Sequence, residues 1–293
     1  MRKLDAREYK LLLNPAKFGT LLTKAHANAF WDGEIAPILD RHWGGSLCVS
    51  DTFDKLLERI LRFWDTRDCA LTAAEFVLRS RVDASNGIAD SSRQEIALKL
   101  RMADFFVVAN THLPGSDGAT TKFEEDIAPL EVKPQGPASP VVFPGRHSTR
   151  SRYSLTTKLD RRWDQSNRTE ARLGKLFPTL EGLLSRPLVG DEALVGGPVI
   201  HELAAKGTQV RIGKDIIGEF TLTCWYFETA PGPPSVAEVS FKYDTIAGEM
   251  PGKAARRALD LFNALQTGLG DYVNTDHSSK TAMALPKSCA SLA

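Results

Sequence analysis

Alternation of apolar and polar residues is the strongest pattern in this chain, and it recurs from one end to the other. Successive side chains of a β-strand point to opposite faces, so each alternating stretch predicts a strand with one polar face. These stretches are residues 4–12, 76–82, 94–102, 120–127, 150–159, 219–227 and 236–244, with a short extended piece at 62–64. Helical patterns are fewer and fall at 15–28, 54–60, 168–184 and 254–269. The chain is therefore expected to be an α+β protein dominated by an antiparallel sheet.

The polar faces of the predicted strands carry charges of both signs. Arg79 and Arg81 share one face of their strand, and Glu238 and Lys242 share a face of another. Antiparallel sheets commonly expose one face to water, so a solvent-facing surface remains an alternative for each strand taken alone. A closed barrel can instead direct one face of every strand into a lumen. Recurrence favours an antiparallel β-barrel with a tunnel for a polyanion and its metal ions, flanked by the helices at 15–28 and 254–269.

The overall charge argues against a protein that coats nucleic acid. Lys and Arg number 37, Asp and Glu number 36, and the net charge is +1. A basic segment at 146–175, with Tyr153 and Trp163, is the exception, and through Arg161 and Arg162 it supports a rival hypothesis of a nucleic-acid patch. Because the rest of the chain balances it, we favour a solvated surface and expect no nucleic-acid partner.

Several features indicate a cytoplasmic protein. No apolar run approaches the ~18 residues of a membrane span, and the first residues are too charged for a secretory signal. The four cysteines are scattered without a CxxC pair, which predicts reduced thiols rather than a disulfide framework. They are Cys48, Cys69, Cys224 and Cys289. Four prolines and two glycines predict a loop at 134–145, and a proline-rich turn is expected at 230–234.

Short motifs follow one another in a definite order. They read AREYK at 6–10, RFWDTRD at 62–68, LRSR at 78–81, IALK at 96–99, KFEED at 122–126, EVSFK at 238–242 and SK at 279–280. This order is similar to that of the CYTH superfamily, also called triphosphate tunnel metalloenzymes, which includes adenylate cyclases and thiamine triphosphatases. The resemblance extends over residues 4–285, with extra length near 26–55 and 132–165. It implies a single tunnel domain over residues 1–293.

The resemblance also implies a function and a site. The function is metal-dependent hydrolysis of a small molecule that carries a triphosphate, with Mg²⁺ or Mn²⁺ as cofactor. Glu8 and Lys99 are expected to take part in the reaction. The residues expected to bind phosphate are Lys10, Arg79, Arg81, Lys99, Lys122, Arg152, Lys158 and Lys280. Those expected to bind metal are Glu8, Glu124, Asp126 and Glu238. Homodimers are frequent in the family, so self-association is a further expectation.

Two positions depart from the family pattern. Ala6 and Ser240 stand where the family has glutamates that bind metal. The remaining carboxylates could still hold one hard divalent ion, because such ions take oxygen ligands and often retain waters. The departures also favour an alternative, a module that binds polyphosphate or nucleotide without turning it over. Cyclisation of the adenylate-cyclase type is a third hypothesis.

Overall fold

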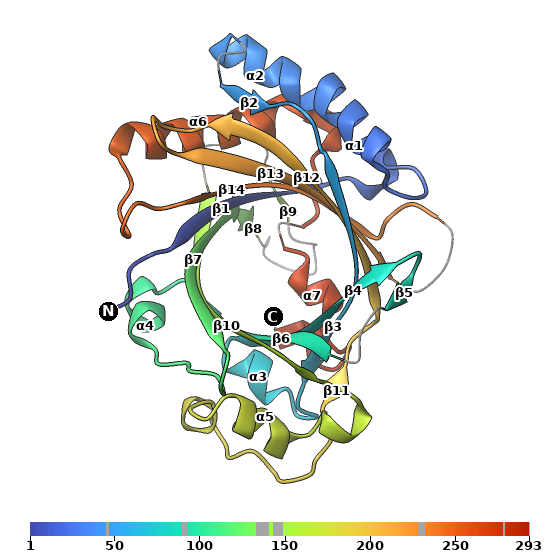
Figure 1. Ribbon diagram of the computed structural model, residues 1–293, viewed down its shortest axis with the longest axis vertical. Coiled ribbons are helices and arrows are strands. Elements are labelled where there is room, and N and C mark those ends of the chain that lie inside the picture. The colour runs from blue at the N-terminus through green and yellow to red at the C-terminus, as the bar shows by residue number, and fades with distance from the viewer. Residues whose placement is uncertain are drawn as a thin grey trace.

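A ring of paired strands organises the computed structural model, which describes residues 1–44, 47–89, 93–132, 141–142, 149–227, 232–277 and 279–292 (Figure 1). Within those residues nine strands pair side by side, and the last pairs with the first to form a ring-like sheet. Around the ring they are β3 (Lys55–Asp65), β12 (Ile200–Arg211), β13 (Ile217–Phe227), β14 (Val236–Asp244), β1 (Ala6–Leu13), β7 (Thr120–Pro129), β10 (Thr149–Arg162), β6 (Arg93–Met102) and β4 (Phe76–Ser85). Ring neighbours are antiparallel, except that β1 and β7 are parallel.

Shorter elements extend the ring and cover it. The short strands are β2 (Cys48–Ser50), β5 (Ile88–Ala89), β8 (Glu131–Val132), β9 (Val141–Val142) and β11 (Val195–Gly196). The α-helices are α1 (Lys24–Phe30), α2 (Ala36–Trp43), α3 (Ala70–Ala73), α4 (Phe105–Asn110), α5 (Glu170–Leu176), α6 (Gly252–Gly268) and α7 (Thr281–Ala284). A π-helical turn (Trp31–Ile35) joins α1 to α2, and 3₁₀ turns occupy Pro15–Lys17, Gln165–Asn167, Glu181–Leu183, Gly270–Tyr272 and Ala290–Leu292. None of the helices in the described part of the chain is long and apolar enough to cross a membrane.

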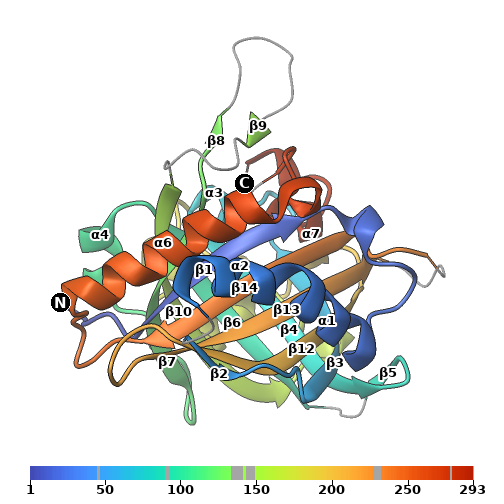
Figure 2. The ribbon, with the colours of Figure 1, turned by 90° about the horizontal axis from the view of Figure 1, so that it is seen from above.

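The two larger hydrophobic cores lie outside the ring, beneath the helices. Helices α1, α2 and α6 lie over β1, β12, β13 and β14 (Figures 1 and 2), and a large buried cluster fills the space between them. Tyr9 of β1 belongs to this cluster and packs against Phe241 and Phe262, with ring centroids 4.9 and 5.0 Å apart. A second buried cluster lies between β4, β6, β7 and β10 and the helices α3, α4 and α5. Alternate residues of the same strands are thereby left to face the inside of the ring.

Most of the strands predicted from alternation are confirmed, whereas most of the predicted helices differ from those observed. The expected helix at 54–60 and extended piece at 62–64 are wrong, since one strand, β3, runs through both. The expected helix at 15–28 is replaced by a 3₁₀ turn and by α1, which starts after Thr23, whose hydroxyl accepts a hydrogen bond from His26 N. The helix expected at 168–184 ends early, at Leu176, two residues before a proline that cannot continue a helix.

The loop expected at 134–145 lies outside the described residues except for β9, and the first two residues of the turn expected at 230–234 also lie outside them. One ring strand, β12, was not expected at all. It contains Gly207, at φ +126°, where the pairing with β13 shifts register. That irregularity interrupts the alternation by which the other strands are recognised.

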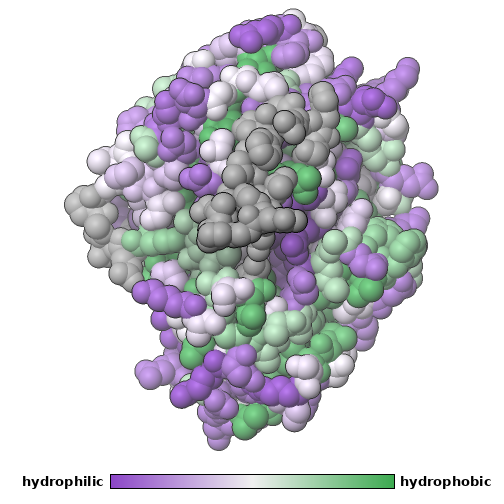
Figure 3. All heavy atoms as spheres, turned by 180° about the vertical axis from the view of Figure 1, so that it is seen from behind, coloured by the Kyte–Doolittle hydropathy of each residue, from purple (hydrophilic) through white to green (hydrophobic). Residues whose placement is uncertain are grey.

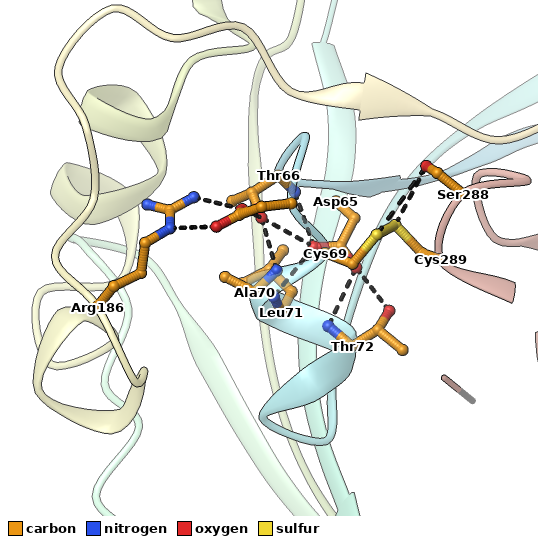
Figure 4. The surroundings of a disulfide bond; sticks show 10 residues. Asp65, Thr66, Cys69, Ala70, Leu71, Thr72, Arg186, Ser288 and Cys289 are labelled. Atoms are coloured by element: carbon orange, nitrogen blue, oxygen red, sulfur yellow. Dashed lines mark hydrogen bonds and ion pairs between the residues drawn. A yellow bond between two sulfur atoms is a disulfide. The ribbon is translucent and has the colours of Figure 1, made fainter. Parts of the chain in front are cut away.

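A disulfide corrects the expectation of four reduced thiols. Cys69 and Cys289 are bonded, with Cα atoms 5.4 Å apart, while Cys48 and Cys224 are free (Figure 4). Their separation of 220 residues gives no local signal of pairing. Because disulfides are rare in reducing compartments, the cysteines no longer support a cytoplasmic location, which stays a prediction.

The disulfide joins the C-terminal segment to the start of α3. Cys69 adopts a left-handed backbone conformation, at φ +63°, immediately before the helix. The buried carboxylate of Asp65 accepts hydrogen bonds from the backbone nitrogens of Leu71 and Thr72, each at 3.0 Å, so the turn that carries Cys69 is firmly held (Figure 4). The segment that follows residue 279 is therefore cross-linked through Cys289 to the turn that precedes α3.

Candidate functional site

The inside of the ring holds a polar cavity of about 680 Å³ to which all nine ring strands contribute side chains. Among the described residues, ten basic and seven acidic side chains line it. The basic ones are Lys10, Arg59, Arg79, Arg81, Lys99, Arg101, Lys158, Lys206, Lys242 and Lys280. The acidic ones are Glu8, Glu124, Asp126, Glu202, Glu219, Glu238 and Asp244. The lining itself has three more basic than acidic side chains, and Glu95, which pairs with Arg79, Arg81 and Lys158, lowers the surplus of the whole site to two positive charges.

One end of the lumen is filled by an apolar cluster. Inward-facing residues of five strands meet Ala284 and Leu285 of the C-terminal segment there. The strand residues are Leu12, Leu61, Phe63, Ile200, Trp225 and Val236. The C-terminal segment and α7 lie within the outline of the ring at the end where β8 and β9 project (Figures 1 and 2). On the face opposite to that of Figure 1, hydrophilic residues dominate the outer rim and some lie recessed near the centre (Figure 3).

Most of the site residues predicted from the sequence lie in this one cavity. They are Glu8, Lys10, Arg79, Arg81, Lys99, Glu124, Asp126, Lys158, Glu238 and Lys280. Lys122 and Arg152 do not line it. Lys122 is exposed near the start of β7. Arg152 pairs with Glu75, with Nη1 and Oε2 3.6 Å apart. That these two residues bind phosphate stays a prediction, although neither lies among the residues that line the cavity.

Asp126 is the centre of one wall. The parallel pairing of β1 with β7 places it beside Glu8. Its buried carboxylate accepts hydrogen bonds from Lys10 Nζ and Lys99 Nζ, each at 2.8 Å. Arg101 Nε lies 3.5 Å away. Burial alone would raise the pKa of Asp126, but these three cations outweigh it and hold that pKa well below its usual range.

Lys99 is the cation that burial affects most clearly. Loss of hydration lowers its pKa to about 8, and the charges of Lys10 and Arg101 act in the same direction while Asp126 opposes them. Lys10 differs, because Asp126 and Glu8 together raise its pKa above the usual value despite its burial. Lys10 therefore stays protonated at neutral pH, and Lys99 gains and loses its proton much closer to neutrality.

A second group of cations surrounds Glu95, which lies on β6 four residues before Lys99 and which the sequence analysis did not single out. Its carboxylate accepts hydrogen bonds from Arg79 Nη2 at 3.2 Å and Arg81 Nη2 at 2.9 Å. Lys158 Nζ lies 3.6 Å from the same carboxylate. Antiparallel pairing of β4 with β6 sets Arg81 opposite Glu95. Three cations thus share one carboxylate, which leaves donor groups for an anionic ligand.

The C-terminal segment supplies the remaining predicted cation. Lys280 Nζ donates to Glu238 Oε1 at 2.8 Å and lies 4.4 Å from the centre of the Trp225 ring. Trp225 Nε1 in turn donates to Glu202 Oε2 at 2.8 Å, and Arg59 Nη1 lies 3.4 Å from the other oxygen of that carboxylate. Lys280 therefore occupies the boundary between the apolar cluster and the polar cavity.

The four carboxylates predicted to bind metal do not fit a metal centre as they are placed. Each is paired with at least one ammonium group. Asp126 contacts Lys10 and Lys99, Glu8 lies 3.2 Å from Lys10, Glu124 pairs with Lys242, and Glu238 pairs with Lys280. In the part of the chain that the structure describes, no group of three or more His, Cys, Asp or Glu side chains is placed to hold a metal ion.

Several cavity residues escaped the sequence analysis for identifiable reasons. Arg101 follows Lys99 by two residues and so lies on the same face of the strand, which the alternation in the sequence indicates. Arg59 lies in the stretch that was interpreted as a helix. Glu202 and Lys206 belong to β12, the strand whose alternation is interrupted.

The basic segment of the rival nucleic-acid hypothesis does not form one surface. Lys158 lines the cavity. Arg161 donates to the backbone oxygens of Asp160 and Asp117, and the exposed Arg162 pairs with Asp164. Arg168 lies over the Trp64 ring, 4.6 Å from its centre. Its described members thus have separate local roles.

No family model matches the chain, and no curated protein does. Several solved structures are similar to it. A Hippeastrum protein described as an adenylyl cyclase with a dominant triphosphatase activity shares 12% identity over 96% of this chain and 94% of its own, with a TM-score of 0.38. A Bacillus halodurans protein described as an adenylate cyclase shares 12% identity over 88% of this chain and 91% of its own, with a TM-score of 0.35. The PH1819 protein of Pyrococcus horikoshii shares 10% identity over 91% of this chain and 92% of its own, with a TM-score of 0.30.

Two of these neighbours are thus described as adenylyl or adenylate cyclases, and one of the two also as a triphosphatase. At such identities and TM-scores the likeness concerns the overall course of the chain and carries no inference about chemistry. What the cavity can bind or catalyse is therefore inferred from the side chains that line it.

Proposed function

We propose that the cavity binds the triphosphate group of a small molecule and hydrolyses its terminal anhydride bond. The observation that supports this most strongly is the surplus of basic over acidic side chains on the inner face of the ring. Hydrogen bonds between charged partners are stronger than neutral ones, and ionic strength screens enclosed charges less than exposed ones. A chain of phosphates is an anion whose length and charge suit such a lining.

The two groups of cations, around Glu95 and around Asp126, would hold different parts of this ligand. Arg79 and Arg81 offer forked guanidinium donors suited to phosphate oxygens. Lys10 and Lys99 offer point charges beside Asp126. In the reaction, a water molecule attacks the terminal phosphorus and the bond from that phosphorus to the bridging oxygen breaks. The bridging oxygen departs with the diphosphate part of the substrate, and the attacked phosphoryl group becomes orthophosphate, with the proton of the water released to solvent. Phosphoryl transfer depends on positioning and on stabilising charge, so no covalent nucleophile is required.

Glu8 is the carboxylate best placed to orient that water. Its side chain is 20% exposed within the cavity lining, and Lys10 is its ion-pair partner. Burial would raise the pKa of Glu8, but the surrounding ammonium groups, Lys10 foremost, lower it overall. The carboxylate is therefore ionised at neutral pH and able to accept a hydrogen bond from water. No step is routed through a metal ion, because the candidate carboxylates are engaged with ammonium groups.

Binding without turnover is the second candidate function. Ala6 and Ser240 carry no carboxylate, and the carboxylates that remain are ion-paired, which favours a cavity that holds its ligand without hydrolysing it. Cyclisation of a nucleoside triphosphate would instead release pyrophosphate. The organic group of the ligand, if any, and self-association of the chain stay open to experiment.

Phosphate release from tripolyphosphate, ATP and thiamine triphosphate tests the proposal, with cyclic nucleotide and pyrophosphate measured in parallel. Glu8→Gln should slow release at least tenfold while tripolyphosphate affinity, measured by calorimetry, changes little, since the substitution keeps size and removes the charge. Arg162→Ala, at a residue whose side chain is 74% exposed, is the control and should change neither quantity. Binding without release would establish the second candidate, and absence of both would refute the proposal.

A further inference from the structure

Three carboxylates of β1 and β7 line the cavity, and besides Lys99, which contacts Asp126 alone, two further ammonium groups stand among them. The first belongs to Lys10, whose Nζ lies 2.8 Å from Asp126 Oδ1 and 3.2 Å from Glu8 Oε2. It bridges two carboxylates that the parallel pairing of β1 with β7 has set side by side. A cation shared by two acidic side chains is the arrangement that a divalent ion would otherwise provide.

The second ammonium belongs to Lys242 of β14. Antiparallel pairing places this residue opposite Glu8, and its Nζ donates a hydrogen bond to Glu124 Oε1. Burial would lower the pKa of Lys242, but Glu8 and Glu124 raise it overall, so the group is charged at neutral pH. Glu8, Glu124 and Asp126 are therefore neutralised by side chains of the protein itself.

A divalent metal would have to compete with both lysines. Mg²⁺ and Mn²⁺ need several oxygens in direct contact, at about 2.0–2.1 Å for Mg²⁺. Gathering Glu8, Glu124 and Asp126 around one ion would leave Lys10 and Lys242 a short distance from a double positive charge, with their own partners removed. Ser240, next to Lys10 across the β1–β14 pairing, offers a hydroxyl there rather than a further carboxylate.

We propose that this cavity takes its polyphosphate as the free anion, and that Lys10 and Lys242 do the work that the family resemblance assigns to divalent metal ions. The inference rests on the proposed function, because it presumes a polyphosphate ligand. Phosphate oxygens would accept hydrogen bonds from the ammonium groups directly, and the surplus of basic side chains in the lining would offset part of the ligand's negative charge without a metal.

Calorimetric titration of the full chain with sodium tripolyphosphate tests this, first in EDTA and then with excess Mg²⁺ or Mn²⁺. We expect the Kd in EDTA to equal that with metal within threefold, or to be tighter, since free metal sequesters the anion. Binding at least tenfold tighter with metal would overturn the inference and leave the proposed function standing. No binding in either condition would overturn both.

Substitution of Lys242 provides the converse test, read through Mn²⁺ binding rather than activity. Lys242→Met keeps the length of the side chain and removes its charge, which frees Glu124 and leaves Glu8 with one ammonium partner. We expect tripolyphosphate affinity in EDTA to fall at least tenfold. We also expect the Mn²⁺ signal in electron paramagnetic resonance to reveal a bound ion that the wild type does not hold. Lys242→Gln serves if the first variant fails to fold.

Lys206→Met is the matched control. Lys206 also lines the cavity and is also ion-paired, with Glu219, and its side chain is 34% exposed against 35% for Lys242. It lies on β12, away from the three carboxylates of β1 and β7, so its loss should create no Mn²⁺ site. Stoichiometric Mn²⁺ binding by the wild type at micromolar concentration, or by the Lys206 variant equally with the Lys242 variant, would contradict the inference.

Discussion

The inner and outer faces of the ring are made by alternate residues of the same strands, and they differ in almost every physical respect. On β13, Phe220 and Leu222 are fully buried in the hydrophobic core beneath the helices. Between and beyond them, Thr221 and Thr223 line the charged cavity. The ring of strands is thus stabilised from outside, while ion pairs line the cavity inside it.

This contrast separates stability from binding along each strand. Burial of apolar surface is the main stabilising contribution to folding, and it is concentrated on the outer face. Buried ion pairs contribute little net stability, because desolvation offsets much of the attraction between the charges. Substitutions on the outer face should therefore act on folding, and those on the inner face on ligand affinity.

The largest expected effect comes from the outer face. Phe220→Ala should lower the free energy of unfolding by about 3–5 kcal/mol, because it removes a fully buried ring and leaves a cavity. Urea denaturation measures this, and tripolyphosphate affinity of the folded protein should not change. Thr221→Ala, one residue along on the inner face, should cost no more than about 1 kcal/mol. Equal losses for the two variants would break the comparison.

Removal of the disulfide acts on both faces at once. Cys289→Ser should lower the free energy of unfolding by about 2–5 kcal/mol, since the cross-link restricts the unfolded chain. It should also weaken tripolyphosphate binding several-fold, because Lys280 then sits on a segment that is no longer anchored. Wild-type protein in dithiothreitol should match the variant in thermal melting and calorimetry. Cys48→Ser, at an exposed free thiol, should match the untreated wild type.

A substitution on the inner face should have the opposite outcome to Phe220→Ala: ligand affinity should fall while stability changes little. Arg81→Ala should weaken tripolyphosphate binding by about 1.5–3 kcal/mol, or at least tenfold, through loss of a charge-assisted contact. Its effect on the free energy of unfolding should stay under about 1 kcal/mol, because Glu95 keeps Arg79 and Lys158 as partners. Paired calorimetry and urea denaturation measure the two quantities. A large loss of stability with intact binding would reverse the roles assigned to the faces.

The period of alternation explains how much could be predicted from the sequence. Where a strand keeps it, as β1 and β4 do, both the strand and its inward residues were found. The stretch that became β3 spaces its apolar residues as an amphipathic helix does, and only pairing with β4 and β12 makes it a strand. Glu8 has Lys10 as a partner on its own strand, but the partners of Glu124, Asp126 and Glu238 could not be predicted, because they come from strands or segments farther along the chain. Lys242, for example, reaches Glu124 across 118 residues.

The position of β1 in the ring bears on how the protein is made in the cell. This strand is translated well before one of its two neighbours, β14, because β1 ends at Leu13 and β14 begins only at Val236. At typical rates of roughly 5–20 residues per second, the nascent chain must wait on the order of ten to fifty seconds with that strand edge unpaired. Unpaired edges invite association with other chains. Production of this protein should therefore depend on chaperones or slow growth more than its finished structure would indicate.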